Sequence, residues 1–164
     1  MSAGRKLSNP ATATATADLR VRAVRAGDLE AVITIDAEIT RLRKPKYWAE
    51  IYRRYGSGRR RERFFLVAQT GGKIAGFVIG EVRDWEFGSP RCGWVFAISV
   101  RADTRLSGVG ARLLESICEG FRRLGVIKVR TMLSRDNHLI LSFFRSQGMM
   151  AARFIPLELD LEKP

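Results

Sequence analysis

The sequence predicts an α+β fold with a mixed, mostly antiparallel sheet. Two strand-like runs, 64–69 and 73–82, are joined by Thr70-Gly71-Gly72, which indicates an antiparallel hairpin. A third run, 92–100, leads through a glycine-containing loop into an amphipathic helix and then another apolar run, the order of a β-α-β unit with parallel strands. The chain has 164 residues, of which 46% are apolar, and this suits one domain around one core.

The first third of the chain predicts one strand and two helices. Residues 1–17 carry a Thr-Ala repeat without an apolar face, so we expect a disordered or flexible leader before a single domain at 18–164. Alternating apolar residues and arginines predict a strand over 19–24. A helix over about 28–41 follows, and Pro45 suits the first turn of a second helix that continues through Tyr55.

The C-terminal third predicts a strand, a helix and a final extended stretch. The strand is expected at 126–133, and the helix runs from about Asn137 to Gln147, where Gly148 ends it. In the stretch 149–161, leucines alternate with acidic residues, which is typical of a strand with one apolar face. Because an edge strand invites pairing, this stretch allows a homodimer. The expected order is therefore β-α-α-β-β-β-α-β-α-β.

Composition excludes several classes of protein. No run reaches the roughly 18–20 apolar residues of a membrane span, and no apolar signal segment stands at the N-terminus, so a cytoplasmic protein without membrane contact is expected. Two cysteines and one histidine supply neither a disulfide framework nor a zinc site, so we expect no metal. The formal net charge of +12 favours anionic ligands or partners.

The segment Arg105-Leu106-Ser107-Gly108-Val109-Gly110 joins the third run to its helix. The free N–H groups and the dipole at a helix start favour an anion, and glycine removes the Cβ atoms that keep a phosphate away. The segment is not a nucleotide-triphosphate loop, since no Gly-Lys-Ser/Thr follows, and it lacks the third glycine of the dinucleotide fingerprint. It predicts a different phosphate-binding loop.

This loop and the element order resemble the GNAT N-acetyltransferase superfamily over about residues 18–155. Arg105, Gly108 and Gly110 match its Q/R-x-x-G-x-G/A loop, and 143–149 resembles its closing aromatic and glycine pattern. The loop spacing is most similar to that of the ribosomal-protein acetyltransferases. The resemblance implies a GNAT-like fold in which two central parallel strands splay into a V, with acetyl-CoA as co-substrate.

The resemblance also assigns residues to the co-substrate. The strand before the loop would pair with the pantetheine arm, the loop and the first helical turn would hold the pyrophosphate, and Asn137 would touch the pantetheine. Phe144, at the position where many relatives have a proton-donating Tyr, would pack against the arm without supplying a proton. The implied cofactor-binding residues are Ile98, Ser99, Val100, Arg105, Leu106, Ser107, Gly108, Val109, Gly110, Ala111, Asn137 and Phe144.

The catalytic base is not marked by any motif. Glu81, at the end of the run 73–82, is the best remaining carboxylate, and a solvated strand-end charge is its alternative reading. Cys92 lacks a paired histidine and reads as an inert thiol, while His138 reads as a helix cap or surface residue. An ordered water could also relay the proton.

The segment 41–63 is strongly basic, with ten Lys or Arg residues against two acidic ones. A solvated face is one reading, and an acceptor with acidic surroundings is the other. The tail after Gly148 is short for the family, and the open cleft this implies favours a protein or peptide amine. We therefore expect an N-acetyltransferase that moves an acetyl group directly from acetyl-CoA to such an amine. The alternatives are a catalytically weak acyl-CoA-binding or regulatory module, a small-molecule amine acetyltransferase, and a nucleic-acid-associated protein that uses the basic face with interleaved aromatics.

Overall fold

A computed structural model describes residues 18–105 and 107–162. The predicted leader 1–17 and Leu106 of the glycine loop lie outside the described residues. Residues up to Thr131 form one compact unit and residues from Met132 form a second, and each is described by itself. No helix in the described ranges is long and apolar enough to span a bilayer.

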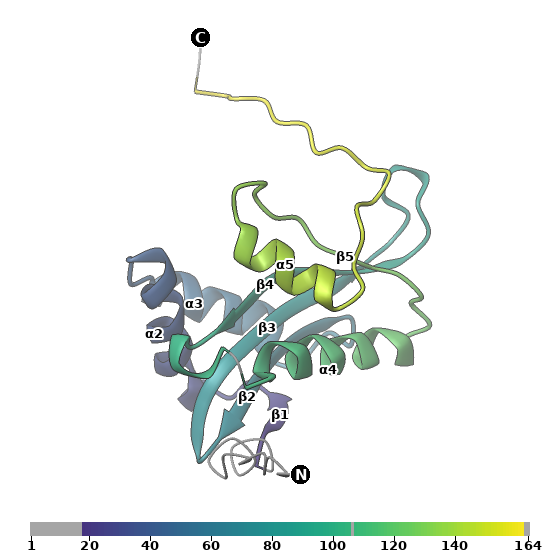
Figure 1. The fold of residues 1–164 in the computed structure, drawn as a ribbon. Helices are drawn as coiled ribbons and strands as arrows, with labels where there is room; N and C mark the ends of the chain where they lie inside the picture. The colour runs from purple at the N-terminus through teal and green to yellow at the C-terminus, as the bar shows by residue number, and fades with distance from the viewer. Residues whose placement is uncertain (1–17, 106, 163–164) are drawn as a thin grey trace, which may run out of the picture. The chain divides into compact units, whose positions relative to one another are not determined.

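The first unit is built on a five-stranded sheet in the order β1-β2-β3-β4-β5 (Figure 1). Neighbouring strands are antiparallel except for the pair β4 and β5, which is parallel, so the predicted mixed α+β sheet is confirmed. The strands are β1 Arg20–Ala23, β2 Arg63–Thr70, β3 Lys73–Arg83, β4 Cys92–Val100 and β5 Val129–Arg130.

Two helices and two short helical turns lie between β1 and β2. The predicted helix over 28–41 begins with a 3-10 turn, η1 Ala26–Asp28, and continues as α2 Leu29–Thr40. The second predicted helix is α3 Pro45–Ile51, which passes into a π-helical turn, η2 Tyr52–Gly56. The remaining elements of this unit are η3 Glu86–Gly88, η4 Ala102–Thr104 and α4 Val109–Arg123.

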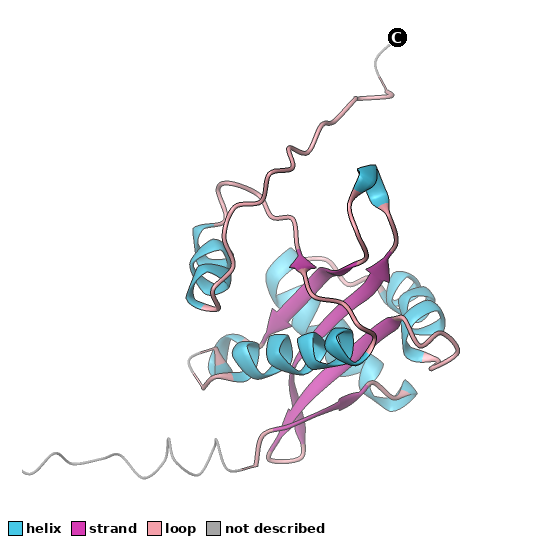
Figure 2. Cartoon of the chain, turned by 90° about the vertical axis from the view of Figure 1, so that its right-hand side faces the viewer, coloured by secondary structure: helices cyan, strands magenta, loops and turns pink. Residues whose placement is uncertain are grey.

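The helices cover opposite faces of the sheet. Trp48 of α3 packs its ring against Phe65 of β2 and Phe77 of β3, with ring centroids 6.2 and 5.1 Å apart. The other face is shaped to receive α4, which lies across the strands in Figure 2. There Gly93 leaves room for Phe121, because a Cβ at Gly93 would stand 2.3 Å from that ring. Gly76 and Gly80 of β3 likewise face side chains of α4, so these three glycines let α4 approach β3 and β4 closely.

The predicted strand over 126–133 is wrong in its extent. Only Val129 and Arg130 form β5, and they pair with Gly93 and Trp94 of β4. The chain before them is held by the turn that ends α4, where the N–H of Val126 donates to the carbonyl of Phe121 at 3.1 Å. A strand needs a ladder partner for each residue, and β4 supplies one for these two alone among the described residues.

Within residues 132–162, the second unit contains one helix, α5 His138–Ser146, which matches the prediction of a helix from about Asn137 to Gln147. Oδ1 of Asn137 caps it by accepting a hydrogen bond from the N–H of Ile140 at 3.2 Å. The predicted final strand over 149–161 is wrong, since residues 149–162 include no strand. Its alternating side chains Leu157, Leu159 and Leu161 are at least 80% exposed, so no partner strand orders them.

Candidate functional site

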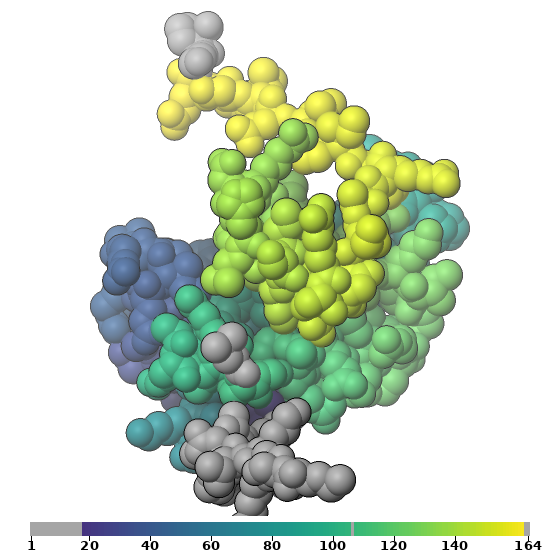
Figure 3. Space-filling model, in the orientation of Figure 1, coloured from purple at the N-terminus to yellow at the C-terminus, as the bar shows by residue number. Residues whose placement is uncertain are grey.

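The loop that follows β4 is shaped by its own hydrogen bonds. The N–H and Oγ of Ser107 both donate to the carbonyl of Thr104, at 3.1 and 2.6 Å. The Thr104 N–H in turn donates to the carbonyl of Arg101 at 3.1 Å. Two successive tight turns therefore carry the chain from the strand to the helix. In Figure 3 this loop and the start of α4, in the teal-green part of the colour range, lie on the surface that faces the viewer.

Gly108 begins α4 in the left-handed conformation, with φ +78° and ψ 5°. A residue with a side chain is strained there, and glycine is not. The carbonyl of Gly108 accepts the first helical hydrogen bond, from the N–H of Arg112 at 3.0 Å. The N–H groups of Val109, Gly110 and Ala111 precede that bond, so the helix itself offers them no acceptor. This helix start therefore has free N–H groups and the positive end of the helix dipole, which favour an anion, and phosphate binding here stays a prediction.

The strand before the loop separates from its parallel neighbour. The pair Trp94↔Arg130 is the last between β4 and β5, so the part of β4 from Val95 to Val100 has no strand beside it on that edge among the described residues. Successive residues of a strand direct their N–H and C=O groups to alternate sides. About half of these groups therefore face the open edge, where an extended amide-bearing ligand can pair with them.

A β-bulge accounts for this separation. In the β3–β4 ladder the partner of Ile79 is Ala97, but the partner of Gly80 is Val95, so Phe96 is an additional residue in β4. A bulge bends the bulged strand and increases its twist. It follows the last β4–β5 pair by two residues, and β4 consequently turns away from β5. No sequence pattern marked Phe96 as the bulge.

Glu81 lies in the same register row as that last pair. It stands opposite Arg63 in β2 and Trp94 in β4, and Trp94 stands opposite Arg130 in β5. With strands about 4.8 Å apart, the backbone of Glu81 is one strand away from the point where β4 and β5 part. The sheet thus brings the predicted base to the inner end of the open edge.

The carboxylate of Glu81 is held by two hydrogen bonds and an ion pair. The hydroxyl of Tyr55 donates to Oε2 at 3.1 Å, Nε of Arg83 donates to Oε1 at 3.3 Å, and Nε of Arg63 lies 3.6 Å from Oε2. The Glu81 side chain is 19% exposed, so it retains limited access to solvent. The carboxylate is thus partly buried and paired, and its role as the base stays a prediction.

Tyr55 links this carboxylate to the bulge. Its ring makes an edge contact with Phe96, with centroids 5.1 Å apart, and the guanidinium of Arg63 lies 5.0 Å from the ring centroid. Burial, followed by the nearby charge of Glu81, raises the pKa of the Tyr55 hydroxyl. The phenol is therefore protonated at neutral pH and acts as a donor. The sequence placed Tyr55 on a helix and among the aromatics interleaved with the basic segment, but it gave no sign of this contact, because nothing local indicates which strand residue Tyr55 meets.

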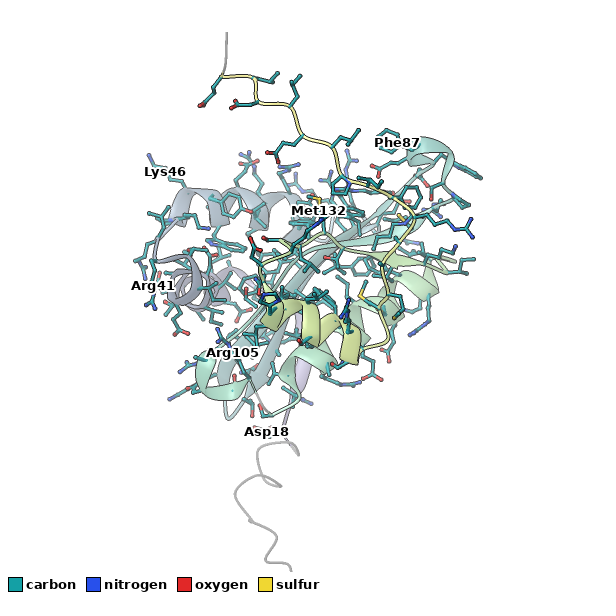
Figure 4. The ribbon with its side chains drawn as sticks, turned by 45° about the horizontal axis from the view of Figure 1, so that its top comes forward. Asp18, Arg41, Lys46, Phe87, Arg105 and Met132 are labelled. Carbon is teal, nitrogen blue, oxygen red and sulfur yellow. The ribbon has the colours of Figure 1, made fainter. Side chains whose placement is uncertain are left out.

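The other residues that were predicted to bind the co-substrate lie in both units. Ile98, Ser99 and Val100 are half-buried on β4, opposite Val78, Phe77 and Gly76 of β3. Arg105 is exposed in the loop, where Figure 4 labels it. In the second unit, Asn137 caps α5, and the ring of Phe144 lies 5.2 Å from that of Phe143.

The two cysteines, Cys92 in β4 and Cys118 in α4, are free thiols. Cys92 is buried, and its Sγ accepts a hydrogen bond from Nη1 of Arg130 at 3.5 Å. Burial raises the pKa of the Cys118 thiol, which keeps that thiol protonated and unreactive. Within residues 18–105 and 107–162, no group of three or more His, Cys, Asp or Glu side chains could hold a metal ion.

The basic segment 41–63 is only partly neutralised. Arg43, Lys44, Arg53 and Arg63 form ion pairs with Glu30, Asp36, Glu50 and Glu81. The other cations of the segment are exposed and form no ion pair with any residue that the structure describes: Arg41, Lys46, Arg54, Arg59, Arg60 and Arg61. This side of the molecule therefore attracts negatively charged groups.

Comparison with known proteins identifies the family. The model of the Acetyltransferase (GNAT) family matches residues 29–149. No curated protein sequence matches the chain.

Solved structures show the same fold. A transcriptional regulator from Bacillus halodurans C-125 has a TM-score of 0.75 at 16% identity, covering 87% of this chain and 99% of that one. The aminoglycoside N-acetyltransferase AAC(6')-Iy in complex with CoA has a TM-score of 0.76 at 14% identity, covering 87% and 95%. An aminoglycoside acetyltransferase from an uncultured soil metagenomic sample, in complex with sisomicin, has a TM-score of 0.70 at 17% identity, covering 90% and 98%.

Proposed function

The chain belongs to the acetyltransferase (GNAT) family, and we propose that it transfers an acetyl group from acetyl-CoA to an amine of a protein or peptide with acidic surroundings. The observation that carries the proposal is the open edge of β4, followed along the chain by the free N–H groups at the start of α4. A thioester with an amide-bearing arm and a terminal pyrophosphate presents groups that complement both features.

Different residues of the first unit are proposed to bind different parts of acetyl-CoA. The main chain of Ile98, Ser99 and Val100 pairs with the arm, and the N–H groups of the first turn of α4 hold the pyrophosphate, with the exposed guanidinium of Arg105 beside them. Leu106 completes the loop in this proposal. Asn137 and Phe144 of the second unit are proposed to contact the pantetheine arm.

Glu81 is proposed as the base. In direct transfer the amine nitrogen forms a bond to the acetyl carbon, the carbon–sulfur bond breaks, and the amine gives up a proton. Glu81 takes that proton, directly or through one water, from a position fixed by Tyr55, Arg63 and Arg83. The leaving thiolate takes its proton from solvent, because Phe144 has no hydroxyl to supply one.

The charge of the surface supports the choice of acceptor. Six exposed cations without ion-pair partners among the described residues repel a polycationic amine and attract an amine set among carboxylates. The two aminoglycoside acetyltransferases named above share 14% and 17% identity with the chain, and the likeness concerns the fold alone.

The test is amine-dependent release of free thiol from acetyl-CoA. The acceptor panel contains acidic peptides, the same peptides with Gln and Asn in place of Glu and Asp, polyamines and an aminoglycoside. We expect thiol release with the acidic peptides, at a kcat/KM at least about tenfold higher than with their neutral versions, which is about 1.4 kcal/mol. Release with polyamines or the aminoglycoside alone would overturn the choice of acceptor. Binding of acetyl-CoA without release by any amine would support the weak acyl-CoA-binding module instead.

A further inference from the structure

The hairpin between β3 and β4 exposes two large aromatic side chains. Trp85 is 69% exposed and Phe87 is 98% exposed, and Figure 4 shows Phe87 at the outer end of this hairpin. Both residues have left-handed backbone conformations, with φ of 44° and 50°. Such a conformation is strained for residues with a side chain. Exposed rings on a strained turn contribute nothing to the core of this unit, so their position calls for another role.

The base of the hairpin is firmly held. Nε of Arg91 lies 2.6 Å from Oδ1 of Asp84, and the N–H of Ser89 donates to the carbonyl of Glu86 at 2.9 Å. Nη2 of Arg130 in β5 donates to Oγ of Ser89 at 2.6 Å. These contacts tie both sides of the turn to the sheet. The two rings are therefore presented from a fixed base, which lowers the entropy lost when a ligand binds them.

An arginine-rich loop lies next to this hairpin. Arg91 also pairs with Glu62, with Nη2 2.5 Å from Oε1, and the N–H of Val82 donates to the carbonyl of Glu62 at 2.8 Å. The segment 57–62 and the hairpin consequently share one end of the sheet. Arg59, Arg60 and Arg61 in this segment are exposed and pair with no acidic side chain in the described ranges. We call Arg59–Arg61 with Trp85 and Phe87 the arginine–aromatic surface.

We propose that the arginine–aromatic surface also binds single-stranded nucleic acid, a function beyond acetyl transfer. The arginines contact the phosphates, and the rings of Trp85 and Phe87 stack on unpaired bases. Free cations beside exposed aromatic rings are the combination that such strands require, because each nucleotide offers one charge and one π face. An anionic bilayer fits less well, since Asp84 and Glu86 stand beside the rings that would have to enter it. An acidic peptide offers charges for the arginines but no regular series of flat faces for the rings.

The experiment measures the affinity of the full chain for a fluorescein-labelled single strand of about 20 nucleotides, by fluorescence anisotropy over a range of salt concentrations. The aromatic variant is Trp85→Leu with Phe87→Leu, and Trp85→Phe is its conservative partner. The arginine variant carries Ala at Arg59, Arg60 and Arg61. The control variant carries Ala at Arg20, Lys46 and Lys73. It also removes three positive charges, but outside the arginine–aromatic surface. In the β2 ladders, Arg20 and Lys73 pair at the opposite end from Arg63, opposite Gln69 and Thr70.

We expect the aromatic variant to bind at least about tenfold more weakly with an unchanged salt slope, and Trp85→Phe to retain most of the affinity. In the arginine variant, the fall of log affinity with log salt should be less steep, by about 2 in the slope. The control variant should change affinity by less than about threefold. The replaced residues are exposed, and an unchanged unfolding midpoint would show that each variant folds.

Three results would overturn the proposal. The first is no binding of the strand even at low salt. The second is an equal loss of affinity in the arginine and control variants, which would indicate attraction by net charge alone. The third concerns two other anionic ligands, polyglutamate of equal charge and vesicles with anionic phospholipid. If either binds as tightly as the strand and loses the same affinity in the aromatic variant, the proposal fails.

Discussion

Glu81 and Trp94 stand directly opposite each other in the β3–β4 ladder, and Trp94 is the last residue of β4 that pairs with β5. The bulge at Phe96 follows two residues later, and Tyr55 spans from the Phe96 ring to the Glu81 carboxylate. The proposed base and the open edge are therefore parts of one local arrangement. A change at Glu81 should affect the reaction without affecting the edge that binds the co-substrate.

Replacement of Glu81 by Gln should remove the base while keeping the size of the side chain. We expect kcat/KM to fall by about 10²- to 10⁴-fold, because that is the usual contribution of a positioned base, while the Kd of acetyl-CoA stays within about threefold. Tyr55→Phe serves as the control, since it removes the hydrogen bond to Glu81 but not the carboxylate. Steady-state kinetics across pH would separate the two, and a wild-type rate in Glu81→Gln would show that another group takes the proton.

Replacement of Gly108 by Ala should weaken the binding of acetyl-CoA. Alanine at φ +78° costs about 1–2 kcal/mol, and relief of that strain would reorient the first turn of α4. Gly71→Ala is the matched control, because Gly71 has φ +54° in the β2–β3 turn and no heavy atom lies within 4 Å of a Cβ there. Both variants should lose similar stability in urea unfolding, but only Gly108→Ala should raise the KM for acetyl-CoA. Equal KM values would contradict the assignment of this helix start.

Replacement of Gly93 by Ala should destabilise the first unit by about 1–3 kcal/mol, the usual cost of overpacking. The new Cβ would stand 2.3 Å from the Phe121 ring, which holds α4 on the sheet. Adding Phe121→Leu should recover part of this loss, which a double-mutant cycle of unfolding free energies would measure. Gly27→Ala, where no heavy atom lies within 4 Å of the added Cβ, should change stability by less than about 0.5 kcal/mol.

Sequence patterns predicted the sheet and most helices because the signals there are local. The turn Thr70–Gly72 and the alternation around it predicted β2 and β3, and the bounds of β4 match the predicted 92–100. The predicted length of the strand over 126–133 was too great, because its true length depends on how far β4 runs beside it. The pairing of Arg63, Glu81 and Trp94 in one row likewise depends on register between distant segments, which no local pattern specifies.

A partly buried ion pair between Arg22 and Asp28 should make stability depend on pH. Hydrogen bonds from the Arg22 guanidinium, with Nη1 2.7 Å from Oδ2, hold the pKa of Asp28 below its usual value of about 4. The unfolded state then binds a proton more readily, so this stabilisation is present above about pH 4 and is lost as the pH falls through the lower, folded-state pKa. We expect Asp28→Asn to be less stable than the wild type at pH 7 and to approach it at low pH.

Urea unfolding at a series of pH values would test this dependence. Glu119→Gln, on the exposed part of α4, is the control and should follow the wild type at every pH. A constant difference in unfolding free energy between Asp28→Asn and the wild type from neutral to low pH would contradict the role given to the ion pair.

Calorimetric titration of the full chain with acetyl-CoA tests the central claim most directly. The open edge of β4 and the start of α4 predict saturable binding of one acetyl-CoA per chain, with an affinity that falls in Gly108→Ala and not in Gly71→Ala. The absence of binding heat, together with an unfolding midpoint that acetyl-CoA does not raise, would contradict it.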